Sequence, residues 1–167
     1  MARRRSRRSA GKRPPAPQPA PQPPAKSWEI RLAEPAEAVY EELVRLAGEA
    51  VDRKDFTSSH CTTLRMVDEV LDRVIPHNPI DRRNALAGAL SNIYRFRKGR
   101  MRIYWIASSE RGQVVVLFIS DTPRKEGDAY DPYEVFGRMV MSGRFAEFFE
   151  QLGVKLPDRV REGYEAH

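Results

Sequence analysis

An uninterrupted apolar segment, Val114–Ile119, constrains the fold of this chain more than any other feature. The turn-forming sequence "SSERGQ" precedes it, and Ser120 follows it. A strand that presents apolar side chains to both faces of a sheet is stable only if both faces are covered. The segment is also far shorter than the roughly 18 apolar residues that a membrane crossing needs. It therefore predicts the central strand of a sheet inside a folded domain.

Length and composition predict one domain with a modest core, since the chain has 167 residues of which 41% are apolar. The N-terminus lacks the apolar stretch of a signal peptide, so we expect a cytoplasmic protein without membrane contact. The single cysteine, Cys61, excludes an intrachain disulfide, and neither it nor the three histidines has the spacing of a metal site. We expect no metal and no cofactor.

Residues 1–26 differ in composition from the rest of the chain. They contain eight Lys/Arg, seven Pro and no acid, which leaves 21 basic and 23 acidic residues for the remainder. This composition predicts a disordered, partly polyproline-II tail, with the folded domain at 27–167. Clustered Lys/Arg could contact nucleic acid or the ribosome. A solvated tail, or a start codon placed too far upstream, is an equal alternative.

The folded part alternates between strand and helix patterns. Apolar residues at every second position predict strands, and apolar residues at helical spacing predict helices. The expected elements are a strand within 27–33, helices at 34–53 and 62–75, strands at 93–97, 101–107 and 114–120, and helices at 132–142 and 145–152.

The segment 92–105, "NIYRFRKGRMRIYW", predicts a β-hairpin with five basic side chains. We place a two-residue turn at Lys98-Gly99, because glycine supplies the positive φ that such turns prefer. Directly opposed residues share a face of the sheet. One face should then carry Arg95, Arg97, Arg100 and Arg102, with Tyr104 further along. The other face, the core, should carry Tyr94, Phe96, Met101, Ile103 and Trp105.

A face with several arginines gains no stability by itself. Like charges directly opposed across a ladder destabilise it by roughly 0.2–1 kcal/mol per pair, and a bound anion would remove that cost. Pairing with acids of the first helix is the alternative, because residues 29–55 contain eight acids and four bases. Composition alone slightly favours that pairing.

The loop after the central strand changes the balance. The sequence "ISDTPRKEGDAYDPYEVF" places Arg124, Lys125 and Tyr130 beside the strand's exit. Loops at the end of a rigid sheet often carry binding and catalytic groups. Tyr130 could instead be an aromatic residue that caps the next helix. Together with the hairpin arginines, these residues predict a concave cationic site with one phenol.

These segments resemble the RelE/ParE superfamily of toxin–antitoxin toxins, and within it the YhaV branch. The resemblance lies in "YRFR", "GRMRIYW", "VVVLFIS" followed by "RKEGDAY", and "YEVFGRMVMSGRF", and "WEIRLAEPAEAVYEEL" is similar to the start of that branch. It covers about residues 27–150. It implies an α+β fold in which an N-terminal strand and two helices pack on a small antiparallel sheet, followed by C-terminal helices.

The resemblance also implies an endoribonuclease that cuts mRNA, usually on the ribosome, by attack of the RNA's own 2′-OH without a metal. The implied catalytic residues are Arg95, Arg97, Arg102, Arg124 and Tyr130. The residues expected to contact RNA are Lys98, Arg100, Tyr104 and Lys125. Arg102 and Arg124 are the expected phosphate clamps, and Tyr130 is the candidate for proton transfer.

One departure leaves the general base open. The best-known RelE pattern has lysines at the positions of Arg95 and Arg97, and arginine, with a pKa above about 12, is a poor general base. A phenol, with an ordinary pKa of about 10, acts as a base near neutral pH only where cations lower that value.

Two other functions remain open from the sequence. A ParE-like toxin would bind DNA gyrase without cutting RNA, but such members tend to lack the basic catalytic set. A non-toxic basic protein that binds RNA or the ribosome is the other. For a toxin, the resemblance implies a cognate antitoxin of the AbrB/MazE-like or RelB-like type.

Overall fold

The computed structural model describes residues 27–122, 125 and 127–160. In chain order the α-helices and strands are β1 (Glu29–Leu32), α1 (Glu34–Asp52), α2 (Ser59–Glu69), α3 (Ile75–His77), β2 (Tyr94–Lys98), β3 (Met101–Ser108), β4 (Gln113–Ser120), α4 (Pro132–Met141) and α5 (Ala146–Leu152). Two short 3-10 helices, Arg82–Asn84 and Gly88–Leu90, lie between α3 and β2. A π-helical turn at Val70–Val74 joins α2 to α3, so the second predicted helix runs on to His77. The predicted α+β class and order of elements are confirmed; the predicted tail lies outside the described residues.

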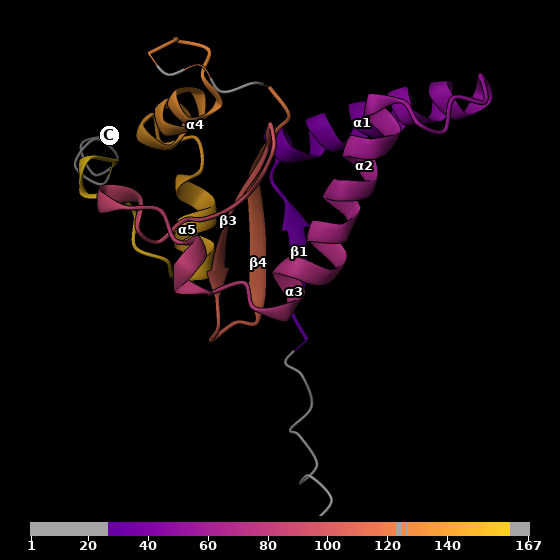
Figure 1. Ribbon diagram of the computed structural model, residues 1–167. Helices are drawn as coiled ribbons and strands as arrows, with labels where there is room; N and C mark the ends of the chain where they lie inside the picture. The colour runs from indigo at the N-terminus through magenta and orange to yellow at the C-terminus, as the bar shows by residue number, and fades with distance from the viewer. Residues whose placement is uncertain (1–26, 123–124, 126, 161–167) are drawn as a thin grey trace, which may run out of the picture.

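The four strands form one sheet in the order β1-β4-β3-β2 (Figure 1). Strand β4 therefore lies between two neighbours, as its apolar sequence predicted. Strands β2, β3 and β4 pair antiparallel, which agrees with the expected sheet. Strand β1 adds a parallel edge, because it pairs with β4 from Glu29–Gln113 to Leu32–Val116.

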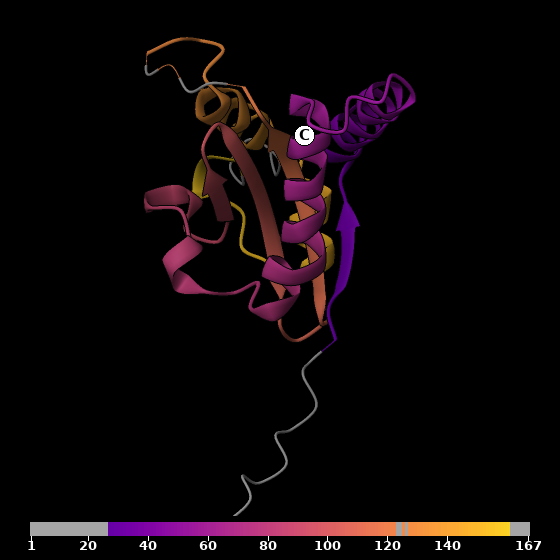
Figure 2. The ribbon, with the colours of Figure 1, turned by 45° about the vertical axis from the view of Figure 1, so that its right-hand side comes forward.

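Helices cover both faces of the sheet (Figures 1 and 2). Helices α1 and α2 lie on one face over a core that includes Ile103, Trp105 and Val116. Helices α4 and α5 lie on the other face over a core that includes Tyr104 and Leu117. Successive β3 residues thus enter opposite cores, as the period of a strand requires.

A β-bulge in β4 strengthens the α4 side of the core. Tyr104 pairs with Phe118, whereas Trp105 pairs with Val116, so Leu117 is the extra residue. Leu117 and Phe118 both contact the core beneath α4. The rings of Tyr104 and Phe136 stack there with centroids 4.1 Å apart. The bulge thereby turns two consecutive β4 side chains toward α4.

The hairpin turn differs from the prediction by one residue. Lys98 pairs with Met101 and Arg97 with Arg102, so Gly99 and Arg100 form the turn, and the predicted Lys98-Gly99 turn is wrong. Gly99 has φ +56° at the first central position, where type II′ turns favour glycine. Each β2 residue therefore pairs with a β3 residue two positions further along than predicted. Because side chains alternate between faces with a period of two, this shift leaves the paired side chains on their predicted faces. Only Arg100 leaves the predicted face, for the turn.

Among the described residues, no helix is both long enough and apolar enough to span a bilayer.

Two glycine substitutions should move stability in opposite directions. Gly99→Ala should lower the free energy of unfolding by about 1 kcal/mol, because an L side chain is strained at its positive φ. Gly48→Ala should raise it by about 0.5–1 kcal/mol, because Gly48 lies in α1 with open space around its Cα. Urea denaturation measures both values. A stabilising Gly99→Ala would contradict the turn geometry.

Candidate active site

Three arginines of the hairpin share the sheet face on which α4 lies. Arg97 pairs directly with Arg102, and Arg95 pairs with Tyr104. Directly paired residues point to the same side of a sheet. We call these four residues the arginine face. Their predicted grouping on one face is confirmed, although the shifted turn changes every cross-strand partner by two residues.

The three arginines make no ion pair with any carboxylate of the described residues. The alternative that they neutralise the acids of α1 is therefore wrong for this part of the chain. Acids of α1 instead pair with Arg45, which contacts Glu42 and Glu49, both at 2.6 Å. Helix α1 lies over the other face of the sheet, away from these guanidinium groups. Within the described residues, the arginine face consequently has no carboxylate that compensates its positive charge.

Arg102 is buried, with 6% of its surface exposed. Its Nη1 donates hydrogen bonds to the carbonyl oxygens of Arg100 at 2.7 Å and Gly99 at 3.3 Å. A guanidinium has five N–H donors, so those on Nε and Nη2 have no partner among the described residues. The turn thus fixes one edge of the Arg102 guanidinium, and the other edge can hold two oxygens of a phosphate.

Tyr104 lies at the inner end of the arginine face and is fully buried. Its ring stacks on Phe136 with centroids 4.1 Å apart, and Phe118 lies beside both rings, at 6.3 Å from the Tyr104 centroid. Burial raises the pKa of the Tyr104 phenol above 10, while the charges of Arg95 and Arg102 only partly oppose that rise. A direct contact between RNA and this hydroxyl, as expected for Tyr104, does not occur in this conformation.

The loop before α4 is tied down by Asp131. This buried carboxylate begins α4 by accepting a hydrogen bond from the backbone N–H of Tyr133 at 3.2 Å. It also accepts one from the backbone N–H of Lys125 at 2.9 Å, across the loop. The side chain of Tyr130 is 82% exposed, and Arg124 lies outside the described residues. The structure therefore leaves the expected roles of Arg124 and Tyr130 untested.

The other two expected RNA contacts lie around the hairpin turn. Lys98 and Arg100 are exposed and line a hollow of about 180 Å³ with Thr63, Met66 and Asp121. Lys98 pairs with Met101, so it belongs to the α2 side of the sheet rather than to the arginine face. These two cations are placed where they could contact an RNA strand that passes over the hairpin turn.

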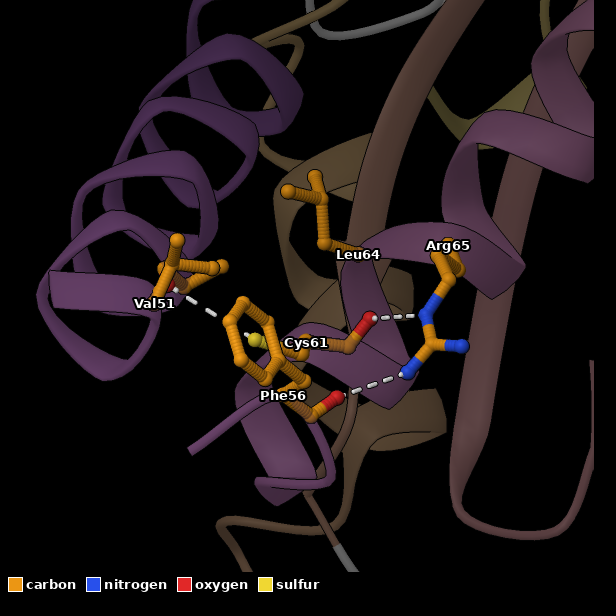
Figure 3. Close-up of a pocket in the computed structure, with 6 residues that line it drawn as sticks. Val51, Phe56, Cys61, Leu64 and Arg65 are labelled. Atoms are coloured by element: carbon orange, nitrogen blue, oxygen red, sulfur yellow. Dashed lines mark hydrogen bonds between the residues drawn. The ribbon is translucent and has the colours of Figure 1, made fainter. Parts of the chain in front are cut away.

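A larger pocket, of about 380 Å³, lies between α1 and α2 (Figure 3). It is lined mainly by apolar side chains, including Val51, Phe56 and Leu64. Its one cation, Arg65, points to the backbone carbonyls of Cys61 and Phe56 and donates hydrogen bonds to both. Because that guanidinium is already engaged, the pocket is poorly suited to a phosphodiester.

Two residues near the site were missed by the sequence reasoning. Asp131 was not selected, although the pattern "DP" before a helix is a recognisable N-cap signal. Tyr133 was not selected either; it packs on the same core as Tyr104, and its phenol contributes to the raised pKa of Tyr104. A second phenol therefore lies near the arginine face.

The arrangement suits the binding of an anion. Three guanidinium groups stand on one rigid hairpin, and their exposure increases from Arg102 through Arg95 to Arg97. Among the described residues, no group of three or more His, Cys, Asp or Glu side chains could hold a metal ion. The arginines of this site can stabilise negative charge on a bound anion.

Residues 31–156 match the sequence profile of a family described as a toxin with endonuclease activity, of a toxin–antitoxin system. The isolated E. coli RelE toxin is a similar solved structure, with 17% identity, a TM-score of 0.43, and coverage of 68% of this chain and 99% of that chain. The RelBE2 toxin–antitoxin complex from Mycobacterium tuberculosis is similar with 18% identity, a TM-score of 0.40, and coverage of 56% of this chain and 90% of that chain. The intact E. coli RelBE toxin–antitoxin complex is similar with 16% identity, a TM-score of 0.42, and coverage of 59% of this chain and 100% of that chain. A comparison with curated proteins gave no match.

The role of Asp131 can be separated from its effect on stability. Asp131→Ala should lower the free energy of unfolding by about 1–2 kcal/mol, because α4 loses its N-cap. It should also impair nuclease activity, because the loop from Lys125 to Tyr130 loses its anchor. Ser58→Ala is the matched control: Ser58 caps α2 by accepting a hydrogen bond from the Cys61 N–H at 3.2 Å, so its loss removes a helix cap and leaves the contact between Asp131 and Lys125 in place. If Asp131→Ala and Ser58→Ala lose the same free energy of unfolding and keep the same nuclease activity, the contact between Asp131 and Lys125 has no role in activity.

Proposed function

The chain belongs to the YhaV family of toxins with endonuclease activity from toxin–antitoxin systems, and we propose that it cuts messenger RNA at the arginine face. This family assignment confirms the predicted YhaV resemblance and the prediction of a nuclease. The RNA substrate and the residues that act on it are our proposal.

The single observation that carries the proposal is the uncompensated charge of Arg95, Arg97 and Arg102. Their guanidinium groups have no carboxylate partner in the described part of the chain, yet they share one face of a rigid hairpin. Preorganised donors of this kind need little rearrangement when charge develops on a phosphate. Removing one such donor typically costs about 10²–10³ in kcat.

RNA contains its own nucleophile, so the protein needs to supply charge and proton transfer. The 2′-oxygen attacks the adjacent phosphorus and gives its proton to a base. The bond between phosphorus and the 5′-oxygen then breaks, and that oxygen takes up a proton. The products are a 2′,3′-cyclic phosphate and a 5′-hydroxyl end. In this proposal Arg102 and Arg124 hold the phosphate oxygens, and Arg95 and Arg97 stabilise the added negative charge.

Tyr130 is the proposed proton-transfer residue. Its loop leaves the sheet next to Ser120, which pairs with Arg102, so the loop starts at the arginine face. The backbone N–H of Tyr130 donates to Asp128 at 2.9 Å, and this turn holds the phenol out toward solvent, where a bound RNA strand can reach it. Tyr133 in α4 is the second phenol that could perform this step.

The partner of the toxin is its cognate antitoxin, since the family belongs to toxin–antitoxin systems. We propose an AbrB/MazE-like or RelB-like antitoxin that covers the arginine face, and action in the cytoplasm on ribosome-bound mRNA. Lys98, Arg100 and Lys125 would contact the RNA backbone outside the cleaved bond. The neighbouring reading frame tests the type of antitoxin.

Arginine substitutions test the site. Arg97→Ala and Arg102→Ala should each lower the rate of RNA cleavage by about 10²–10³-fold and abolish growth arrest on induction, because the phosphorane loses a preorganised cation. Arg111→Ala is the matched control, because Arg111 lies at the opposite end of the sheet, next to the Ser108–Gln113 pair. Purified variants are assayed on RNA with and without ribosomes, and their melting temperatures are compared.

Two results would refute this site. The first is RNA cleavage that survives both arginine substitutions. The second is growth arrest with intact transcripts and damaged DNA, which would indicate a gyrase-directed toxin.

The proton-transfer proposal has its own test. Tyr130→Phe should lower the cleavage rate by at least about 10²-fold and leave RNA binding unchanged, since general acid–base catalysis contributes about 10²–10⁴-fold. Tyr133→Phe is measured beside it under single-turnover conditions. If only Tyr133→Phe loses activity, the role belongs to the phenol of α4.

A further inference from the structure

The Tyr104 hydroxyl is the one side-chain polar atom in the described part of the chain that is buried without a hydrogen-bond partner. Buried polar groups in proteins are nearly always paired, because an unpaired group loses its hydrogen bonds to water and gains nothing in return. Phenylalanine would fill the same place without that cost. The unpaired hydroxyl is therefore a candidate for a hydrogen bond that forms in another state of the site.

Packing determines where the hydroxyl stands. The Tyr104 ring stacks on Phe136 at 4.1 Å with an interplanar angle of 14°, and Phe118 flanks it. The ring cannot turn away without breaking this aromatic cluster. Arg95 lies directly opposite Tyr104 in the ladder, and Arg102 lies two residues earlier on the same strand face. The phenol is thus held in place beside two guanidinium groups.

The neighbouring arginine is close but not bonded. Arg95 favours the phenolate form of Tyr104 by its charge and as a potential donor, although no hydrogen bond of normal geometry joins the two side chains. Arg95 is half-buried and has no ion-pair partner among the described residues. A small movement of this long side chain would bring an N–H group onto the phenol oxygen.

We propose that Tyr104 is a positioning residue whose hydroxyl oxygen accepts a hydrogen bond from Arg95 when an RNA phosphate binds at the arginine face and shifts that guanidinium slightly. A guanidinium is planar and has five donors, so one edge can hold the phosphate while another N–H meets the phenol. The inference rests on the proposed function, because it deepens the role of Arg95 in the same site.

Two properties exclude a direct catalytic role for Tyr104. Its side chain has no exposed surface, so RNA cannot reach it. Burial also raises its pKa, so the phenol stays protonated and neutral near pH 7, with its oxygen lone pairs available to a donor. Tyr104 therefore acts through Arg95.

The test is Tyr104→Phe, which removes only the hydroxyl. The cleavage rate constant at saturating RNA should fall about 10- to 100-fold, the range expected for one hydrogen bond to a charged group. Affinity for an oligonucleotide with a 2′-deoxy cleavage site should stay within about twofold, because the other cations still bind the backbone. The melting temperature should not fall and should rise by up to roughly 8 °C, because an unpaired buried group has been removed.

A double-mutant cycle shows whether the effect passes through Arg95. In an Arg95→Ala background, Tyr104→Phe should cause no further loss, because the donor is already absent. Tyr94→Phe is the matched control, since Tyr94 precedes Arg95 on β2 and points to the opposite face, where it stacks on Trp105. It should cleave RNA at the rate of the unmodified protein.

Several outcomes would overturn the inference alone. The first is a fully active Tyr104→Phe variant while Arg95→Ala is inactive. The second is a loss of activity in Tyr104→Phe that accompanies a lower melting temperature. The third is that Tyr104→Phe lowers the cleavage rate by the same factor in the Arg95→Ala background as in the unmodified protein. Full activity of both Arg95→Ala and Arg102→Ala would instead overturn the proposed function itself.

Discussion

Burial of β4 on both faces is the constraint on which the rest of this structure depends. Val114 to Leu117 have no exposed surface, so helices must cover the sheet from two sides. The segment between β1 and β2 supplies α1 and α2 for one side, and the segment after β4 supplies α4 and α5 for the other. Each fully buried large apolar side chain in these two layers contributes roughly 1.5–3 kcal/mol. The hairpin of β2 and β3 extends from this double core.

The candidate site lies where the cover from α4 ends. Along one face of the hairpin, side chains change from a fully buried tyrosine to an exposed arginine, and none of the three arginines meets a carboxylate in the described part of the chain. Low-dielectric surroundings at the inner end strengthen the field of these cations. Stability and function oppose each other here. The aromatic packing that fixes the Tyr104 ring also leaves its hydroxyl without a hydrogen-bond partner. Arg102 donates hydrogen bonds from Nη1 to two carbonyl oxygens of the turn. The proposed binding of a phosphodiester at these cations fits the membership of the chain in a family of endonuclease toxins.

The sequence predicted the faces of the hairpin better than its register. Alternation of Tyr94, Arg95, Phe96 and Arg97 is a local property, so it survives a turn that moves by one residue. The choice between the turns Lys98-Gly99 and Gly99-Arg100 was not visible, because glycine is acceptable at either central position of a two-residue turn. The bulge at Leu117 could not be seen either, because every residue around it is apolar. The alternative that Arg95 and Arg97 neutralise acids of the first helix could be dismissed only after the helix was placed on the opposite side of the sheet.

By itself the sequence determined the order and type of the elements, the central position of the Val114–Ile119 strand and the common face of Arg95, Arg97 and Arg102. These follow from residue periodicity, which acts over a few neighbouring residues. Only the tertiary structure decided that no described carboxylate reaches the arginines, that Asp131 anchors the loop before α4, and that Phe136 seals Tyr104 beside Arg95. These depend on contacts between segments far apart in the chain, which form only when the two cores pack together. The physical reason is that charge compensation and desolvation are set by distance in space, and local sequence patterns do not specify that distance.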